Sequence, residues 1–499
     1  MTYSLKDNSK YKEWFEGNDS VSFENCLLNR GDFGRFLADY LVSEKDGFVL
    51  NIDSPWGTGK TEFLKRLYVE LITRKYPCVY IDAWESDFSE APLKVVASEL
   101  VSQLELFNED IGKLDGRDKL KDGFSKFLKT SAILSTGVAS GLLKSYGLPI
   151  DSSMLTDAMI VGADTSDSTE LQKLLTDHQE QIQAIRTIRE SLSQLAETLA
   201  SVRGLKVPVV VLIDELDRCR PNYSVELLEV VKHFFATENL VFVIASDTEQ
   251  LESSIKVLYG ETFDSKRYLK RFFDRVATLP EPDIGHYLKI HNLEKLDDSR
   301  QIMLYPIKAV FKMSGLSLFE LPFLWCTQLF NLKIRDIDQV IQKVKACLQV
   351  LSQRNQGKII AVNLIVLVAA VCESHLGLTS YTQRSSKAGK DDSPSEHKYG
   401  NHSVQPSLPK DLRCIYQLSF NMVKTHKRKG EFQEEIEGLV HYEVVRQAFI
   451  TNSSKSNLDI TIEDQYRSIC SQLDSQGSNI QMLLWSDYKQ LIDLAGYIS

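Results

Sequence analysis

Residues 54–61, Ser-Pro-Trp-Gly-Thr-Gly-Lys-Thr, place two glycines, a lysine and a hydroxyl group directly after an apolar run. Glycines allow the backbone to close around an anion, and backbone amides at the start of a helix attract phosphate. Lys60 can reach the terminal phosphates of a nucleotide, and the Thr61 hydroxyl can ligate Mg²⁺. The strict phosphate-loop pattern begins with glycine, whereas this chain has Ser54. The residues expected to contact a nucleotide are Ser54, Pro55, Trp56, Gly57, Thr58, Gly59, Lys60, Thr61 and Glu62.

A second group of charged residues follows the apolar run 208–213, which ends in Asp214 and Glu215. An acid at the tip of a buried strand can hold the Mg²⁺ shell, and the next residue can orient and deprotonate an attacking water. Phosphoryl transfer needs mainly the placement of charge around the terminal phosphate. The two groups together therefore predict hydrolysis of a nucleoside triphosphate, with Asp214 and Thr61 at the metal and Glu215 as the base.

Apolar runs elsewhere in the chain predict the elements that position these residues. Continuous runs of this kind are typical of parallel strands covered on both faces, and they lie at 48–52, 78–82, 209–214, 241–245 and near 276–279. More than one crossover helix separates the second run from the third, which predicts a helical insertion at about 91–202. The fold class is therefore α/β, with a mostly parallel five-stranded sheet.

The remaining pattern divides the chain into further regions. We expect residues 1–47 to form a helical segment that packs on a nucleotide domain at 48–282, because apolar residues recur there at helical spacing. Residues 283–377 have a helical pattern and predict a separate helical region, which corresponds to the lid that the family resemblance described below implies. Residues 378–411 contain few apolar side chains and predict a disordered linker or loop. Residues 412–499 are expected to be helical.

Composition narrows the class of protein. The chain has 499 residues, 43% hydrophobic and 25% charged, which suggests several globular domains. A net charge of −10 argues against a surface that coats nucleic acid, and the short basic run 426–429 has no interleaved aromatic residue, so nucleic-acid binding is possible but unsupported. Eight cysteines scattered singly, with no zinc-ligand spacing, favour reduced thiols. No secretory signal is visible at the N-terminus, so a cytoplasmic location is expected.

Two apolar stretches, 130–143 and 359–372, bear on membrane attachment. Each is shorter than the roughly 20 residues that cross a bilayer as a helix. We therefore expect two buried helices and no membrane span.

With these motifs in this order, the chain resembles the KAP family of P-loop NTPases over roughly residues 28–345. The family's markers are Pro-Trp-Gly-Thr-Gly-Lys-Thr at 55–61, Tyr-Ile-Asp-Ala-Trp at 80–84, Ile-Asp-Glu-Leu-Asp-Arg-Cys at 213–219, Phe-Val-Ile-Ala-Ser-Asp at 242–247 and Tyr-Leu-Lys-Arg-Phe-Phe at 268–273, before Leu279-Pro280. The resemblance implies a domain of the additional-strand, catalytic-glutamate class with a helical lid, and ATP with Mg²⁺ as its cofactors. It also implies a homo-oligomer. Bacterial members are associated with phage exclusion and defence, so the resemblance further implies partner proteins of the same defence system.

The same resemblance suggests roles for residues beyond the two central groups. Either Ser246 or Asp247 occupies the place of a sensor that hydrogen-bonds the terminal phosphate or the water, although a strand-to-turn cap explains them equally. Arg271, beside Lys270, resembles an arginine finger, and Arg335 resembles a lid arginine that reaches the phosphate. Both arginines are also typical of a solvated helix face.

Arg218 and Asp217, which follow the acidic pair, also allow two interpretations. Arg218 can face the nucleotide of a neighbouring subunit, or Asp217 can cap a helix beside a surface arginine. A competing hypothesis for the whole chain is a nucleotide-gated oligomeric scaffold that hydrolyses slowly or not at all and recruits effector partners. The long amphipathic run 169–202 and the absence of an effector motif favour the scaffold, whereas Glu215 favours hydrolysis.

Overall fold

The computed structural model describes residues 9–106, 192–305, 319–385 and 480–497, apart from short internal gaps, together with short pieces between 397 and 439 and a few isolated residues. The chain divides into two compact units, residues 1–281 and 282–499, and each is described by itself. The insertion expected at 91–202 lies mostly outside the described residues. Its described parts are a helix at its start and a helical piece at 192–201.

A five-stranded parallel sheet forms the centre of the first unit, as the apolar runs predict. Its order is β2-β3-β4-β1-β5, and every neighbouring pair is parallel. The strands are β1 (Phe48–Asp53), β2 (Cys78–Asp82), β3 (Val209–Asp214), β4 (Leu240–Ser246) and β5 (Arg275–Thr278). The three central strands β3, β4 and β1 are almost fully buried, which is why they read as continuous apolar runs. Because all strands are parallel, their carboxyl ends meet at one edge of the sheet.

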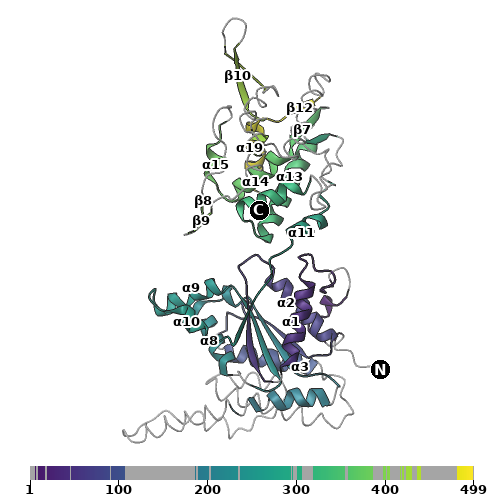
Figure 1. The fold of residues 1–499 in the computed structure, drawn as a ribbon, viewed down its shortest axis with the longest axis vertical. Helices are drawn as coiled ribbons and strands as arrows, with labels where there is room; N and C mark the ends of the chain where they lie inside the picture. Colours follow the sequence, from purple (N-terminus) through teal and green to yellow (C-terminus); the bar gives the residue numbers. More distant parts are fainter. Residues whose placement is uncertain are drawn as a thin grey trace, which may run out of the picture. The chain divides into compact units, whose positions relative to one another are not determined.

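Helices cover both faces of this sheet (Figure 1), with α1 and α2 on one side and α8, α9 and α10 on the other. The helices of the unit are α1 (Gly31–Ser43), α2 (Lys60–Thr73), α3 (Pro92–Leu106), α8 (Pro221–His233), α9 (Thr248–Tyr259) and α10 (Ser265–Leu269), with short 3-10 turns η1 (Lys12–Trp14) and η2 (Leu216–Arg218). The N-terminal segment packs into the first unit, because Phe23, Leu37 and Leu41 belong to its hydrophobic core.

The second unit mixes helices with strands. Residues 283–377, expected to be mainly helical, also contain two short strands, and most of residues 412–499, expected to be helical, lie outside the described residues. The helices of the unit are α11 (Ile284–Ile290), α12 (Leu321–Phe330), α13 (Ile334–Gln353), α14 (Leu364–His375), α15 (Thr379–Gln383) and α19 (Trp485–Ala495). A parallel sheet of order β12-β7-β6 joins β6 (Ile302–Tyr305), β7 (Ile359–Asn363) and β12 (Ile480–Met482). Two antiparallel pairs join β8 (His397–Tyr399) to β9 (His402–Val404) and β10 (Thr425–Lys429) to β11 (Glu435–Leu439).

The apolar stretch 359–372 is one of the places where the prediction fails. It was expected as one buried helix, but it begins as strand β7 and continues as helix α14. The isoleucines and valine of β7 favour an extended backbone. Asn363 then caps the helix, because its side chain accepts a hydrogen bond from the Val366 amide at 3.2 Å.

The predicted linker 378–411 is folded where it begins. Helix α15 lies there, and the Arg384 side chain is buried. Arg384 donates to both carboxylate oxygens of Glu373, at 2.6 and 2.8 Å, and its guanidinium lies 3.7 Å from the Phe420 ring centroid. This fully buried pair holds residue 384 inside the second unit, which a composition argument does not foresee.

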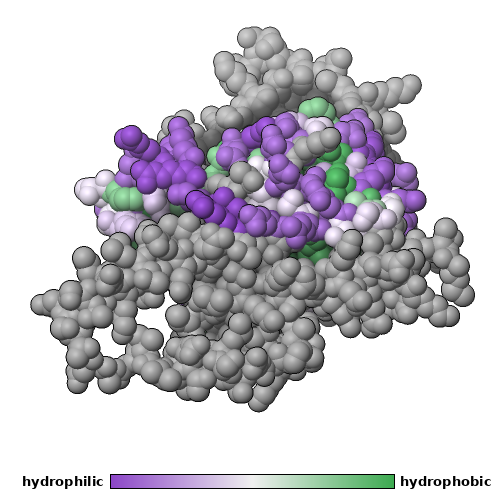
Figure 2. Space-filling view, turned by 90° about the horizontal axis from the view of Figure 1, so that it is seen from below, coloured by the Kyte–Doolittle hydropathy of each residue, from purple (hydrophilic) through white to green (hydrophobic). Residues whose placement is uncertain are grey.

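No helix among the described residues is long and apolar enough to cross a membrane. Polar side chains also predominate on the described part of the face that Figure 2 shows, where hydrophobic side chains appear only in small patches.

Candidate active site

The loop between β1 and α2 has the backbone that its glycines predict. Gly57 and Gly59 have φ angles of 76° and 89°, a region that other residues adopt only with strain. A Cβ on Gly59 would lie 3.0 Å from Leu28 Cδ1, so this position is also crowded. Gly59 precedes α2, and no side chain caps this helix, so its first amides remain available to an anion.

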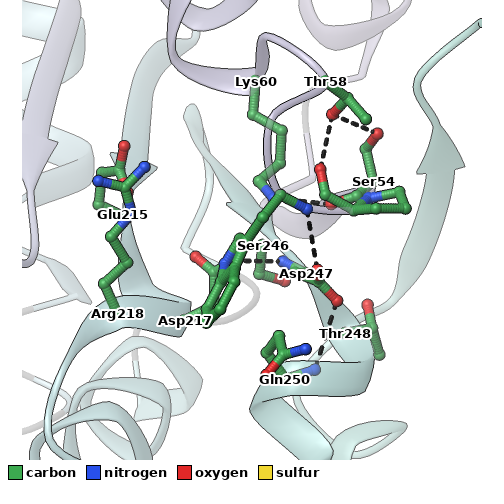
Figure 3. A network of polar contacts seen from close by, with 12 residues as sticks. Ser54, Thr58, Lys60, Glu215, Asp217, Arg218, Ser246, Asp247, Thr248 and Gln250 are labelled. Atoms are coloured by element: carbon green, nitrogen blue, oxygen red, sulfur yellow. Dashed lines mark hydrogen bonds and ion pairs between the residues drawn. The ribbon is translucent and has the colours of Figure 1, made fainter. Parts of the chain in front are cut away.

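Ser54, the departure from the phosphate-loop pattern, helps to hold the loop closed. The Thr58 hydroxyl donates to the Pro55 carbonyl at 2.7 Å, so the 2.7 Å contact between the Ser54 and Thr58 hydroxyls must use the Ser54 proton. The Ser54 amide donates to the Ser246 carbonyl of the neighbouring strand at 3.2 Å. A serine therefore replaces the first glycine without loss of loop geometry (Figure 3).

Lys60 and Thr61 connect this loop to the acidic residues that follow β3. Lys60 Nζ donates to the Ser54 carbonyl at 2.7 Å and lies 3.4 Å from an Asp217 carboxylate oxygen. The Thr61 hydroxyl donates to Glu215 Oε1 at 2.9 Å. The two residue groups identified in the sequence thus lie in direct contact.

Asp214, at the end of β3, is buried and held by hydrogen bonds. The Tyr80 hydroxyl of β2 donates to Oδ2 at 2.8 Å, and the Glu215 amide donates to Oδ1 at 2.9 Å. Burial raises the pKa of Asp214, while the hydrogen bond from Tyr80 opposes that rise. Tyr80 was not predicted as part of the site.

Glu215 combines an unusual backbone with a raised pKa. Its φ angle is 59°, which is uncommon for a residue other than glycine and often marks a functional position. Burial, reinforced by the negative charge of Asp214, raises its pKa above the ordinary range of glutamate. A base with a raised pKa accepts a proton more readily than an exposed glutamate does.

Arg218 lies beside Glu215 in the same chain (Figure 3), and its Nε forms an ion pair with Glu215 Oε2. Its guanidinium also lies 5.8 Å from the ring centroid of the exposed Trp84. The Trp84 of the family marker thus supports the arginine that faces the candidate base.

Asp217 does not cap a helix, so that interpretation is wrong. It lies inside the turn η2, and its Oδ2 accepts a hydrogen bond from Trp56 Nε1 at 2.6 Å and one from the Asp247 amide at 2.9 Å. Lys60 approaches the same oxygen. Asp217 is therefore a buried acid beneath the phosphate loop.

Ser246 and Asp247 have different environments. Ser246 is fully buried and donates to Asn51 Oδ1 at 2.9 Å. The Asp247 carboxylate accepts from the Trp56 amide at 3.0 Å and caps α9 by accepting from the Gln250 amide at 3.3 Å. Of the two sensor candidates, only Asp247 contacts the loop through its side chain; burial raises its pKa.

Arg30 is a buried residue of the site that sequence reasoning missed. It donates to the Thr58 carbonyl at 2.7 Å and to the Pro280 carbonyl at 2.8 Å. It therefore ties the phosphate loop to the segment after β5. A lone arginine before a helix gives no signal of this role in the sequence.

Three other candidates take no part in the described hydrogen bonds and ion pairs of this network. Glu62 pairs with Arg66 on α2 at 2.7 Å and is half-exposed. Arg271 is exposed, and the described residues provide no hydrogen-bond or ion-pair partner for its guanidinium. Arg335 is exposed in the first turn of α13, in the second unit.

The donors at this edge fit Mg²⁺ and a nucleotide phosphate. Among the described residues no group of three or more His, Cys, Asp or Glu side chains is placed to hold a metal ion alone. Mg²⁺ is usually bound through one or two protein oxygens together with substrate phosphates. The Thr61 hydroxyl and the Asp214 carboxylate supply such oxygens, and Thr61 lies in the first turn of α2, whose N-terminus has no side-chain cap.

A phosphate loop with its lysine, beside acids at the tip of a neighbouring strand, defines a nucleotide-binding P-loop NTPase. The chain belongs to the KAP family, because the model of the KAP family P-loop domain matches residues 33–281. No curated protein matches the chain. Among solved structures, that of C. elegans PCH-2 is similar with 13% sequence identity over 72% of each chain and a TM-score of 0.26, a level of likeness that supports no conclusion about this site.

Proposed function

We propose that the protein is an Mg²⁺-dependent ATPase. The observation that carries this proposal is the contact between the Thr61 hydroxyl of the phosphate loop and the Glu215 carboxylate of the acidic pair, at 2.9 Å. The two groups have complementary roles in phosphoryl transfer. The Thr61 hydroxyl can bind the Mg²⁺ of the nucleotide, and the Glu215 carboxylate can orient and deprotonate the attacking water. ATP rather than GTP is inferred from membership of the family.

Each residue has a distinct task in this proposal. Bound Mg·ATP supplies the reacting phosphate and the metal charge. Lys60 and the first amides of α2 hold phosphate oxygens, while Thr61 and Asp214 hold the metal. Glu215 takes the proton of the attacking water, and the burial that raises its pKa strengthens it as a base. Asp247, which contacts the loop, is the preferred sensor.

The proposal extends to the arginines and to an oligomer. Arg271 is exposed on the first unit and its guanidinium has no described partner, so it can serve as a finger in the site of a second copy. Arg335 is proposed as the lid arginine. A mixture of Arg271→Ala and Glu215→Gln chains tests action between subunits, since it should regain phosphate release that neither variant shows alone. No recovery at any ratio would remove the finger from the proposal.

Phosphate release by the purified protein tests the central assignment. We expect turnover in the wild type that requires Mg²⁺, and its loss in Lys60→Ala and Glu215→Gln. Lys65→Ala is the matched control, because Lys65 lies on the same helix and its described contact is the Trp14 ring. Turnover unchanged in both site variants would refute the assignment. Negligible wild-type turnover with ATP-dependent oligomers would instead support the nucleotide-gated scaffold.

The setting proposed from the family is bacterial phage defence together with partner proteins. Cells that carry the chain with its neighbouring genes should resist phage, and Glu215→Gln should abolish the resistance. Equal plaque counts with and without the intact genes, over a panel of phages, would refute this setting and leave the ATPase assignment standing.

A further inference from the structure

Two hydrogen-bond donors of the phosphate loop and one backbone amide that follows β4 converge on one carboxylate oxygen. Asp217 Oδ2 accepts from Trp56 Nε1 at 2.6 Å and from the Asp247 amide at 2.9 Å, and Lys60 Nζ lies 3.4 Å away. The Asp217 side chain is only 1% exposed. Its other oxygen, Oδ1, is buried and has no hydrogen-bond partner among the described residues.

The three donors are not held equally. Hydrogen bonds between charged groups are normally about 2.7–2.9 Å long. The Trp56 indole is closer than this, whereas the Lys60 ammonium is farther away and makes its short bond to the Ser54 carbonyl instead. Lys60 is therefore the donor that Asp217 releases most easily.

We propose that Asp217 is a positioning residue that competes with nucleotide phosphate for the Lys60 ammonium and transmits the outcome to Trp56. The inference rests on the proposed nucleotide binding. Lys60 turns toward phosphate and gives up its contact with Asp217. The carboxylate then keeps only the Trp56 indole and the Asp247 amide, so the indole hydrogen bond strengthens.

Trp56 is placed to respond to this change. Its backbone amide donates to the Asp247 carboxylate at 3.0 Å, while its indole donates to Asp217. Trp56 is nevertheless 46% exposed. Trp56 is hydrogen-bonded to both Asp217 and Asp247 and is also exposed. A change in the contacts of Asp217 therefore reaches a side chain on the surface of the loop.

Asp217→Asn tests the competition by its sign. An asparagine oxygen still accepts from Trp56 but carries no charge, so phosphate no longer competes with a carboxylate for Lys60, and the loop loses one charge that repels phosphate. The dissociation constant of Mg·ATP, measured by calorimetry, should fall at least about fivefold, which is the effect of one unit charge about 4 Å away even at the dielectric constant of water. The Asp217 carboxylate is buried and lies 3.4 Å from Lys60 Nζ. A purely structural role predicts weaker binding instead. Unchanged or weaker binding would overturn the proposal.

The indole N–H signal of Trp56 gives a second readout that does not depend on turnover. In protein labelled with ¹⁵N-tryptophan, Trp56→Phe assigns the signal, and Asp217→Asn should move it upfield because the hydrogen bond becomes neutral. Mg·ATP should move the wild-type signal downfield but leave that of Asp217→Asn nearly in place. If the wild-type indole signal does not shift at saturating Mg·ATP, nucleotide binding does not affect Trp56 through Asp217, and this part of the proposal is wrong.

The controls separate the two proposals. If the wild type does not bind Mg·ATP, the proposed function fails; if it binds normally but Asp217→Asn binds no tighter, only the role of Asp217 fails. Should Asp217→Asn not fold, Trp56→Phe tests the competition in reverse. Without the indole donor, Asp217 should hydrogen-bond Lys60 more strongly, so Mg·ATP binding should weaken by a few fold. Tighter Mg·ATP binding would refute the proposal.

Discussion

Replacement of Tyr80 by phenylalanine should lower the free energy of unfolding of the first unit. The size of this decrease should show whether Asp214 is ionised. The Tyr80 hydroxyl donates to Asp214 Oδ2 at 2.8 Å, and Tyr80 is 4% exposed. The substitution removes one oxygen and leaves the ring, so the core packing is kept. The substitution removes a hydrogen bond that the buried Asp214 carboxylate accepts, and water cannot readily replace that bond.

The magnitude follows from the kind of bond that is lost. A hydrogen bond to a charged group contributes about 1.5–3 kcal/mol, whereas one between neutral groups contributes about 0.5–1.5 kcal/mol. Asp214 keeps the 2.9 Å bond from the Glu215 amide, so the loss is partial. We expect Tyr80→Phe to lower the free energy of unfolding of the first unit by about 2 kcal/mol.

Tyr68→Phe is the matched control, because the Tyr68 hydroxyl meets the neutral Ser9 hydroxyl at 2.7 Å. Both tyrosines lie in one aromatic cluster, with ring centroids 5.2 and 5.4 Å from that of Trp14. Amide hydrogen exchange of peptides from β2 and β3 measures the first unit separately from the second. A cost for Tyr80→Phe no larger than that for Tyr68→Phe would refute the view that a buried charge is being held.

Two further predictions concern the phosphate loop and the second unit. Gly59→Ala should raise the Mg·ATP dissociation constant at least tenfold in calorimetry, because φ is 89° and the new methyl group meets Leu28; unchanged affinity would contradict this. Burial tends to raise the pKa of Asp336, but hydrogen bonds from His375 and the Lys333 amide lower it below its usual 3.8. The stabilisation is therefore present at neutral pH and lost as pH falls through the lowered pKa, so Asp336→Asn should reduce the urea midpoint at pH 7, and by progressively less as the pH falls below 3.8.

The part of the fold that could be predicted is the part that local sequence determines. Each central strand of the first sheet is a continuous apolar run, because helices cover both of its faces. The phosphate loop is equally local, since Gly57, Gly59, Lys60 and Thr61 lie within five positions of one another. The strand β7 was missed because a short apolar run fits a strand and a buried helix equally well.

The supporting residues of the site could not be predicted, because their partners are distant in sequence. Tyr80 and Asp214 are 134 positions apart, and Arg30 and Pro280 are 250 positions apart. Only the register of the parallel sheet, which places β2 beside β3, brings the first pair together. A single sequence contains no signal of such pairs before the strand order is known.

Asp217 shows why a residue beside a motif can be misjudged. In the sequence it follows Glu215 by two positions, and an acid before a helix such as α8 is ordinarily a cap. The positive φ of Glu215 and the turn η2 redirect the backbone, so the Asp217 carboxylate points back beneath the phosphate loop instead of toward α8. The acidic run thus serves two sides of one site: Asp214 and Glu215 face the side where Thr61 lies, and Asp217 contacts Lys60 and Trp56. A substitution at Asp217 should therefore alter phosphate affinity, whereas one at Glu215 should alter the chemical step.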